Sequence, residues 1–273
     1  MSGLQVLALG IDIGSASSKC VVLSGGFDIA AHCIVPTGTG TSGPGRAVEA
    51  ALTGVGVGMG QISYVVATGY GRNTFDAANE TVSEISCHAK GAVFIMPEVR
   101  TVIDIGGQDV KALAIGADGK LDNFVMNDKC AAGTGRFLEV MARVFELEVD
   151  ELARQDEKAA GIIPVSSTCV VFSEAEVISQ LANNAPIPDL IVGIHQSAAA
   201  RAVSLLKRIG VNEPLLMTGG VANNAGVVNA LKRALGVEIK TSEYSQLAGA
   251  LGAAVYAMER LSVMENEKWK MEN

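Results

Sequence analysis

Ile11-Asp12-Ile13-Gly14-Ser15 ends an apolar run near the start of the chain, and Ile103-Asp104-Ile105-Gly106-Gly107 ends another apolar run 92 residues later. Lys19 and Lys111 are separated by the same offset, so the pattern is an internal repeat. Short apolar runs of this kind are typical of buried strands. Each copy therefore predicts a strand that carries one aspartate at its carboxyl end.

The glycines after each aspartate indicate a binding turn. Glycine lets the backbone approach a ligand closely and leaves N–H groups available to an anionic oxygen. Two such turns facing each other would hold phosphate groups, and Asp12 and Asp104 would hold a magnesium ion directly or through its waters. A third turn, Thr218-Gly219-Gly220, follows another apolar strand and would let a flat group lie against bare backbone. Glycine after a strand is often only a turn signal, but a repeat with a matched acid favours function.

Composition excludes several classes of partner. The chain has 273 residues, 49% of them hydrophobic, and a net charge of -8. An acidic chain without a basic stripe does not suit nucleic acid or an anionic membrane surface. The N-terminus has no charged region followed by a cleavage site, and no uninterrupted apolar run reaches the roughly 18 to 20 residues of a membrane span. We expect a cytoplasmic protein with no nucleic-acid and no membrane partner.

The order of expected elements is the same in both halves. Strands are predicted near residues 5–13, 19–23, 28–34, 62–67, 101–105, 110–115, 120–125, 214–218 and 237–241, and helices near 45–53, 83–95, 188–209, 222–235 and 246–260. Three strands followed by alternating helices and strands, twice, predict a duplicated α/β domain. We expect a first domain of residues 1–97 plus about 246–273 and a second of 98–245. The last helix is rich in small residues, which favours close packing, and its charged tail is expected to fray.

The five cysteines fall into two groups. An odd number in a chain without an export signal favours thiols over disulfides. Cys130 is followed by apolar positions at helical spacing, and Cys169 is followed by the capping-box pattern Ser173 to Glu176. Both are therefore expected at element ends, with Cys130 at a helix N-terminus, where the helix dipole favours a thiolate. Core positions are expected for the other three, Cys20, Cys33 and Cys87.

Two cysteines are too few for a four-ligand metal site. A two-fold dimer supplies four, because the symmetry doubles each ligand. We hypothesise that Cys130 and Cys169 from each of two subunits hold one metal centre at the dimer axis. Iron–sulfur and zinc fit this ligand count equally well, and spectroscopy distinguishes them.

Nine motifs cover nearly the whole chain, and NDKCAAGTGRF is the most specific. They are GIDIGSASSK, GTGTSGPGR, ATGYGRN, VIDIGGQDVK, MNDKCAAGTGRF, SSTC, SEAEVISQL, MTGGVANN and GALGAA. In these motifs the chain resembles the ATP-dependent activators of 2-hydroxyacyl-CoA dehydratases, within the BadF/BadG/BcrA/BcrD ATPase family. The resemblance implies two ribonuclease H-like domains of the actin-like ATPase fold, with ATP in the interdomain cleft and a cluster-bridged homodimer.

The resemblance also implies an activity. A flavodoxin or ferredoxin would reduce one [4Fe-4S] cluster per homodimer, ATP binding and hydrolysis with Mg²⁺ would change the angle between the domains, and one electron would pass to the dehydratase. Its cofactors would be ATP or ADP, Mg²⁺ and the cluster, with Cys130 and Cys169 as cluster ligands.

Nucleotide contacts are likewise implied by the resemblance. The first phosphate loop is Gly14, Ser15, Ala16, Ser17 and Lys19, the second is Asp104, Gly106, Gly107 and Gln108, and the nucleoside lies on Gly219, Gly220 and Asn223 or Asn224. Ala16 replaces a more usual threonine and so removes one hydroxyl. The catalytic set is Gln108 with Asp104 and Asp12, because a neutral side chain orients water without taking its proton. Asp109 is the nearby acid that would act as a base instead.

Other functions share parts of this pattern. A small-molecule kinase of the same superfamily would have both phosphate turns, but it needs a carboxylate base and a substrate pocket. The ATPase subunit of a benzoyl-CoA-type reductase is a second alternative. A filament protein of the actin type is a third, and a closed cysteine-bridged dimer would oppose it.

Overall fold

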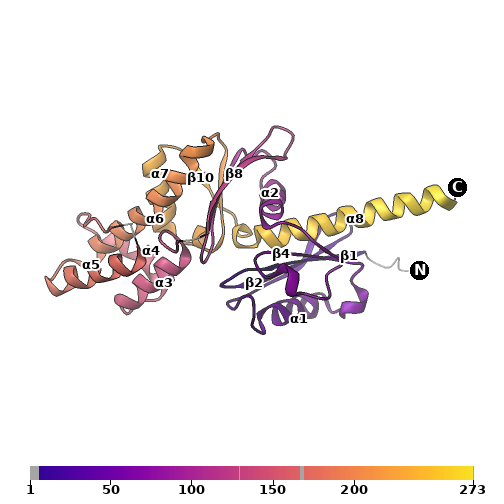
Figure 1. The fold of residues 1–273 in the computed structure, drawn as a ribbon, viewed down its shortest axis with the longest axis horizontal. Coiled ribbons are helices and arrows are strands. Elements are labelled where there is room, and N and C mark those ends of the chain that lie inside the picture. The colour runs from indigo at the N-terminus through magenta and orange to yellow at the C-terminus, as the bar shows by residue number, and fades with distance from the viewer. Residues whose placement is uncertain (1–5, 129, 167–168, 273) are drawn as a thin grey trace. The chain divides into compact units, whose positions relative to one another are not determined.

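The computed structural model describes residues 6–128, 130–166 and 169–272 (Figure 1). Lys129, Ser167 and Thr168, which belong to the two cysteine motifs, lie outside the described residues. The chain divides into two compact units, residues 1–97 with 247–273, and residues 98–246. Each unit has one five-stranded mixed sheet.

The sheet of the first unit has the strand order β3-β2-β1-β4-β5. Its strands are β1 (Leu7–Ile13), β2 (Ser18–Ser24), β3 (Asp28–Val35), β4 (Tyr64–Thr68) and β5 (Glu80–Thr81). The first three are antiparallel neighbours, whereas β4 and β5 run parallel to β1. Its helices are α1 (Gly43–Val55), α2 (Glu84–Ile95) and α8 (Ala248–Glu272), with short 3-10 turns at Met59–Gln61 and Arg72–Thr74.

The side chains of β1 point alternately to the two faces of this sheet. Leu9 and Ile11 belong to an apolar cluster with Ala47 and Val48 of α1. The opposite face meets α8, as the ribbon shows (Figure 1). There Gly10 leaves room for the helix, because a Cβ at this position would overlap Ala250 O and Ala254 N. The functional aspartate of β1 therefore lies on the α8 side.

Small residues also join α2 to α8. A Cβ at Gly91 would overlap the carbonyl oxygen of Ala248, and one at Gly252 would overlap the carbonyl oxygen of Cys87. The backbones of α2 and α8 are therefore in direct contact, as the small residues of the last helix predict.

The sheet of the second unit has the order β10-β9-β6-β7-β8, which is the order of the first sheet when each unit is numbered from its own start. Its strands are β6 (Thr101–Ile105), β7 (Val110–Ile115), β8 (Leu121–Asn127), β9 (Leu215–Thr218) and β10 (Ile239–Lys240). Its helices are α3 (Gly135–Val144), α4 (Val149–Gln155), α5 (Val170–Ala182), α6 (Ile187–Ile209) and α7 (Ala225–Leu235), with 3-10 turns at Asp156–Lys158, Gly220–Asn223 and Ser245–Leu247.

The core of the second unit forms between the sheet and its helices. Ile103 and Ile105 of β6 pack with Phe137 of α3, Leu206 of α6 and Leu231 of α7. The predicted strands and long helices are confirmed with small shifts of their ends.

Three boundaries differ from the expectation. Helix α5 begins at Val170 and not at Ser173, so the expected capping box lies inside the helix. Helix α4 has no counterpart among the expected elements. The last helix was expected to end near residue 260 but continues to Glu272, so the charged tail from Glu265, which was expected to fray, is helical.

One described helix is long and apolar enough to cross a membrane by length and composition. It spans Ser245–Glu267, and 61% of its apolar window is buried inside the structure. Burial of this kind is typical of a core helix, and it agrees with the packing of α8 on β1.

Candidate functional site

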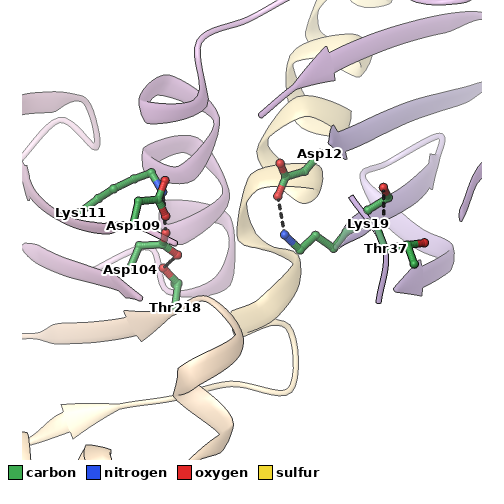
Figure 2. A network of polar contacts seen from close by, with 8 residues as sticks. Asp12, Lys19, Thr37, Asp104, Asp109, Lys111 and Thr218 are labelled. Atoms are coloured by element: carbon green, nitrogen blue, oxygen red, sulfur yellow. Dashed lines mark hydrogen bonds and ion pairs between the residues drawn. The ribbon is translucent and has the colours of Figure 1, made fainter. Parts of the chain in front are cut away.

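The first aspartate turn is built on an ion pair. Asp12 ends β1 and lies opposite Lys19 of β2 in the strand register. The Lys19 Nζ lies 3.1 Å from the Asp12 Oδ2 (Figure 2). Asp12 is buried, whereas 15% of the Lys19 side chain is exposed. The lysine of the repeat is therefore held by the aspartate of its own copy and still reaches solvent.

The second copy has the same pair in a more enclosed setting. Asp104 lies opposite Lys111 in the register of β6 and β7, and the Lys111 Nζ lies 3.1 Å from the Asp104 Oδ2. Asp109 adds a second carboxylate, with its Oδ1 2.9 Å from the same nitrogen (Figure 2). The Thr218 hydroxyl donates to the Asp104 Oδ1 at 2.8 Å. Only 2% of the Lys111 side chain is exposed, so this lysine is a buried cation.

Matching backbone hydrogen bonds close both turns. The Gly14 N–H donates to the Ser17 carbonyl, and the Gly106 N–H donates to the Asp109 carbonyl, each at 3.0 Å. Ser17 and Asp109 are again separated by the offset of the repeat. The duplication seen in sequence is therefore present in the hydrogen bonding of the turns.

A glycine from a neighbouring strand supports each turn. Gly69, after β4, has a φ of +87° and lies against the Asp12 carboxylate and the Ile13 carbonyl, where a Cβ would overlap both. Gly219, after β9, has a φ of +84° and lies in the same way against the Ile105 carbonyl. Gly219 belongs to the predicted third turn. The equivalent role of Gly69 was missed, although its motif ATGYGRN contains the glycine that marks it.

The loop after β3 also holds the first turn. The Thr39 N–H donates to the Gly14 carbonyl at 2.9 Å, and Gly38 lies so close to the Gly14 and Ser15 carbonyls that a Cβ would overlap them. These contacts were missed because the sequence indicated only a surface loop followed by a helix. The repeated glycines of GTGTSGPGR are the signal that could have found them.

The other predicted nucleotide residues differ in exposure. Ala16 and Gln108 are exposed at the two turns, as is Gly220. Asn223 is also exposed, and its Nδ2 donates to the Gln246 Oε1 at 3.3 Å. Asn224 is buried, and its Oδ1 caps α7 by accepting the Val227 N–H at 3.0 Å. Of the two alternative asparagines, Asn223 is the one available to a ligand.

The second turn is joined to the segment that carries Cys130. The N–H groups of Gly135 and Arg136 donate to the carbonyls of Gly106 and Gly107, at 2.8 and 2.9 Å. Cys130 lies five residues before Gly135 and is half-buried. Gly133, with a φ of +83°, lies between them and packs on Arg201 of α6.

The two functional cysteine predictions have different outcomes. Cys169 is the N-cap residue of α5, so its expected place at an element end is confirmed. The N-cap of α3 is Thr134, so the expectation that Cys130 lies at the helix N-terminus is wrong. The apolar spacing correctly predicted the helix. A turn separates Cys130 from it, and in this turn the Thr134 hydroxyl donates a hydrogen bond to the Ala131 carbonyl.

The other three thiols follow the core prediction in part. Cys20 and Cys87 are buried, and burial raises the pKa of the Cys20 thiol well above its usual range and that of Cys87 to about 12. Cys33 is half-buried on β3, opposite Cys20, and packs against the core cluster of the first unit, so its expected core position is confirmed in part. Strand β3 is at the edge of the sheet, so even its inner face is partly open.

The side chains predicted as metal ligands can be compared with the metals that they were expected to bind. Among the residues that the structure describes, no three His, Cys, Asp or Glu side chains come together as a metal site. Cys130 and Cys169 provide two half-buried thiols from one chain, which fits a centre shared by two chains. Lys19 pairs with one oxygen of Asp12, whereas Asp104 pairs with Lys111 through one oxygen and accepts the Thr218 hydroxyl with the other. Carboxylates of this kind suit contact with a hydrated cation.

Two mixed α/β sheets with duplicated aspartate–glycine turns define an ATPase of the actin-like fold. The fold alone is shared with a ROK family glucokinase from Streptomyces griseus, at 16% identity and a TM-score of 0.55 over 93% of this chain and 99% of that one. The chain belongs to the BadF/BadG/BcrA/BcrD ATPase family, whose model matches residues 9–257. This confirms the resemblance that the motifs predicted.

Three relatives that are 50 to 55% identical to the chain are dehydratase activators. The chain is 55% identical to the activator of lactoyl-CoA dehydratase of Anaerotignum propionicum, over 92% of this chain and 97% of that one. It is 50% identical to the (R)-2-hydroxyglutaryl-CoA dehydratase activating ATPase of Acidaminococcus fermentans, over 94% and 99%. A solved structure of the 2-hydroxyisocaproyl-CoA dehydratase activator from Clostridium difficile with bound ADPNP matches with a TM-score of 0.93 and 49% identity, covering 96% and 98%.

Proposed function

We propose that the protein is an ATP-dependent one-electron donor that activates a 2-hydroxyacyl-CoA dehydratase. The observation that carries the proposal is the hydrogen bonding of the second glycine turn to the segment of Cys130. A nucleotide turn and a thiol that share backbone hydrogen bonds suit a protein in which nucleotide binding acts on a redox centre. The similarity to dehydratase activators supplies the acceptor.

ATP is bound through the backbone of both aspartate turns. The first phosphate loop is Gly14, Ser15, Ala16, Ser17 and Lys19, and the second is Asp104, Gly106, Gly107 and Gln108. Lys19 reaches solvent and carries a charge that a phosphate would attract. The nucleoside lies against Gly219 and Gly220, beside the exposed Asn223. We therefore propose that ATP binds in the interdomain cleft, as the resemblance to the family implies.

Asp12 and Asp104 would hold Mg²⁺ directly or through its waters. Lys19 and Lys111 each hold one oxygen of these carboxylates, so each carboxylate has a fixed direction. Magnesium usually keeps several waters and takes one or two carboxylates, which this arrangement offers. The cation supplies charge neutralisation for the phosphates.

Gln108 is the residue that orients the attacking water. Its side chain is exposed at the second turn and has no charge to take a proton from that water. Asp109 is the alternative base, but its carboxylate lies 2.9 Å from the Lys111 Nζ. The Asp109 carboxylate is thus engaged by the lysine, which favours Gln108 and slow hydrolysis.

Cys130 and Cys169 from two chains hold one [4Fe-4S] cluster, which supplies reversible one-electron storage. Support for a homodimer comes from α5, which begins at Cys169. Val171, Phe172 and Ile178 on this helix are 66%, 68% and 52% exposed. Exposed apolar side chains that lie together on one helix mark an interaction surface. We propose that a second copy of the chain covers them, since the same helix must approach its partner to share the cluster.

The electron enters from a flavodoxin or ferredoxin and leaves to the dehydratase. Five thiols without a disulfide suit the reducing cytoplasm. The net charge of -8 gives no support to a nucleic-acid or anionic-membrane partner. The kinase and the benzoyl-CoA-type reductase subunit are less well supported, because the relatives that are 50 to 55% identical are dehydratase activators.

Anaerobic purification tests the proposal. The homodimer should be brown, contain about four irons per two chains, and lose its colour on reduction. Cys130→Ser and Cys169→Ser should each lose iron, whereas Cys33→Ser, at another half-buried thiol, should keep it. With ATP, Mg²⁺ and a reduced flavodoxin, the protein should activate lactoyl-CoA dehydratase. A colourless protein that binds ATP would overturn the redox function, and zinc in place of iron would also do so.

A further inference from the structure

Ser173 and Glu176 do not form the capping box that their spacing predicts. Helix α5 begins at Val170 after the N-cap residue Cys169, so both residues lie inside the helix. Their side chains both reach back to Ser166, three residues before the cysteine. The Glu176 Oε2 accepts the Ser166 N–H at 2.8 Å, and the Ser173 hydroxyl donates to the Ser166 carbonyl. One helix therefore binds both backbone groups of one loop residue.

The hydrogen bonds to Ser166 restrict the chain because Ser173, which makes one of them, is buried. Ser173 is fully buried, so water cannot easily replace its hydroxyl as donor to the Ser166 carbonyl. The Ser173 N–H in turn donates to the Cys169 carbonyl at 2.9 Å, within the helix. The chain is consequently fixed to α5 at Ser166 and again at Cys169. The backbone of Cys169 itself is thus bonded to α5, and so is the backbone of Ser166 three residues before it, which limits the directions that the Cys169 side chain can take.

The segment before Ser166 is held from a second helix. The Asp189 Oδ1, in the first turn of α6, accepts the N–H groups of Ala160 and Gly161 at 2.8 and 3.1 Å. The Asp189 carbonyl accepts the Ile163 N–H at 3.1 Å. Helix α6 thus fixes the approach to the cysteine, and the contacts to Ser166 fix the last part of it. Together, the contacts from α5 and α6 hold the segment before Cys169 at several points, and capping of α5 does not need them.

We propose that Ser173 and Glu176 are positioning residues for the cluster ligand Cys169. They hold the thiol in the direction needed for the metal before the metal binds, as supporting residues do around other metal sites. This inference rests on the proposed function, in which Cys169 is a cluster ligand. It assigns no ligand role to either residue, because their polar atoms are directed to the backbone of Ser166.

The first experiment measures iron loss from the anaerobic homodimer to an excess of a ferrous chelator. Ser173→Ala and Glu176→Ala should release iron about tenfold faster than the wild type or more, since supporting residues typically change metal affinity by that factor. Glu176→Gln keeps an oxygen acceptor for the Ser166 N–H and should stay close to the wild type. Glu174→Gln, two residues before Glu176, removes a charge without touching either contact and serves as the matched control.

A second measurement does not depend on iron. The rate at which iodoacetamide alkylates Cys169 should differ several-fold from the wild type in the metal-free full-length variants Ser173→Ala and Glu176→Ala. The rate at Cys130 should stay the same. The denaturation midpoints of the four variants show whether any variant has unfolded instead. The double variant should be no worse than the stronger single variant, because both contacts act on one residue.

The outcomes separate the two proposals. A wild type without iron overturns the proposed function and, with it, the role of these residues at a cluster. A wild type that holds iron, with variants that release it at the same rate and alkylate Cys169 at the same rate, overturns the positioning role alone. Equal changes at Cys130 and Cys169 also overturn it, because they indicate a general loss of structure.

Discussion

The backbone N–H of Gly135 donates a 2.8 Å hydrogen bond to the carbonyl oxygen of Gly106. Gly106 belongs to the second aspartate turn, and Gly135 is the first residue of α3. Cys130 lies only five residues before Gly135, so a displacement of the turn acts on the cysteine segment through a short length of chain. The equivalent bond of the first copy runs from Thr39 N to Gly14 O, and the cysteine before it, Cys33, is fixed in strand β3. In the second copy the thiol of Cys130 lies in a loop instead.

Removing this donor should uncouple the nucleotide from the cluster. Proline suits the first position of a helix, and Thr134 before it is already extended, with φ -108° and ψ 176°. Gly135→Pro therefore removes the N–H without breaking α3, and its ring also pushes the Gly106 carbonyl away from the helix start. In the wild type, ATP should change the rate at which a chelator removes iron, and in Gly135→Pro the ATP effect should be lost.

Gly135→Ala is the control for this prediction. Its Cβ would lie 3.3 Å from the Gly106 carbonyl, a close contact that keeps the N–H. The ATP effect should persist in Gly135→Ala. An ATP effect of equal size in the proline variant would show that the coupling follows another route.

The two repeat lysines should differ in their contribution to stability. Lys111→Met leaves the buried carboxylates of Asp104 and Asp109 without the lysine that lies between them, and should cost about 3 to 5 kcal/mol. Lys19→Met should cost about 1 to 2 kcal/mol, because Lys19 is partly solvated and paired to one carboxylate. Denaturant midpoints measure both costs. Lys120→Met, in an exposed pair with Asp118, is the control and should cost less than about 1 kcal/mol. Equal costs for the two repeat lysines would contradict the difference in burial.

The supporting glycines should not tolerate alanine. Gly69→Ala and Gly219→Ala combine a left-handed backbone with overlap against the carbonyls of Ile13 and Ile105, and each should destabilise by about 3 kcal/mol or more. Gly236→Ala has the same kind of backbone, with φ +69°, and open space around it. Its cost should be only the backbone strain, about 1 to 2 kcal/mol. Unfolding measurements that give one value for all three would remove the steric explanation.

Thiol reactivity should follow burial. At neutral pH the metal-free chain should react with iodoacetamide at the half-buried thiols, including Cys130 and Cys169. Cys20 and Cys87 should stay unmodified, because burial hides them and raises the pKa of both thiols. Peptide mass spectrometry identifies the modified residues. Rapid labelling of Cys87 in the folded chain would count against its place under α8.

Acid should weaken the attachment of α8 to β5. Arg260 donates two hydrogen bonds of 2.8 Å to the Glu80 carboxylate, and these bonds lower the pKa of Glu80. Because the pKa is lower in the folded state, the pair stabilises the fold above the ordinary glutamate pKa and loses this effect as the pH falls below it. Glu80→Gln should cost about 0.5 to 1 kcal/mol at pH 7. The difference from the wild type should shrink as the pH falls below about 4.5, whereas Glu267→Gln should show no such trend.

Much of the fold was predictable because its determinants are local. The apolar runs before Asp12 and Asp104 specified two strands, and the offset between them specified a duplication that recurs in the hydrogen bonds of the turns. The long helix α6 followed from its spacing, with ends within a residue of the expectation. These features depend on residues close together in the chain, which a pattern can capture.

The missed features depend on contacts between distant residues. Ser173 and Glu176 have the spacing of a capping box, but the helix starts four residues earlier because Cys169 and not Ser173 takes the N-cap position. Thr39 lies on the first turn only because the loop after β3 folds back onto Gly14. The burial of Lys111 depends on Asp109, which the sequence suggested as a base and not as its partner. Tertiary contacts decided each of these cases.

The two copies of the repeat differ in the number of carboxylates around the lysine, and this difference has an electrostatic consequence. Lys19 faces one carboxylate, so that copy is formally neutral, whereas Lys111 faces two, which leaves an excess negative charge. A polyanion approaching the second copy is repelled unless a counter-ion accompanies it. Electroneutrality therefore makes the second half of the duplication the more dependent on a divalent cation, although both halves descend from one sequence pattern.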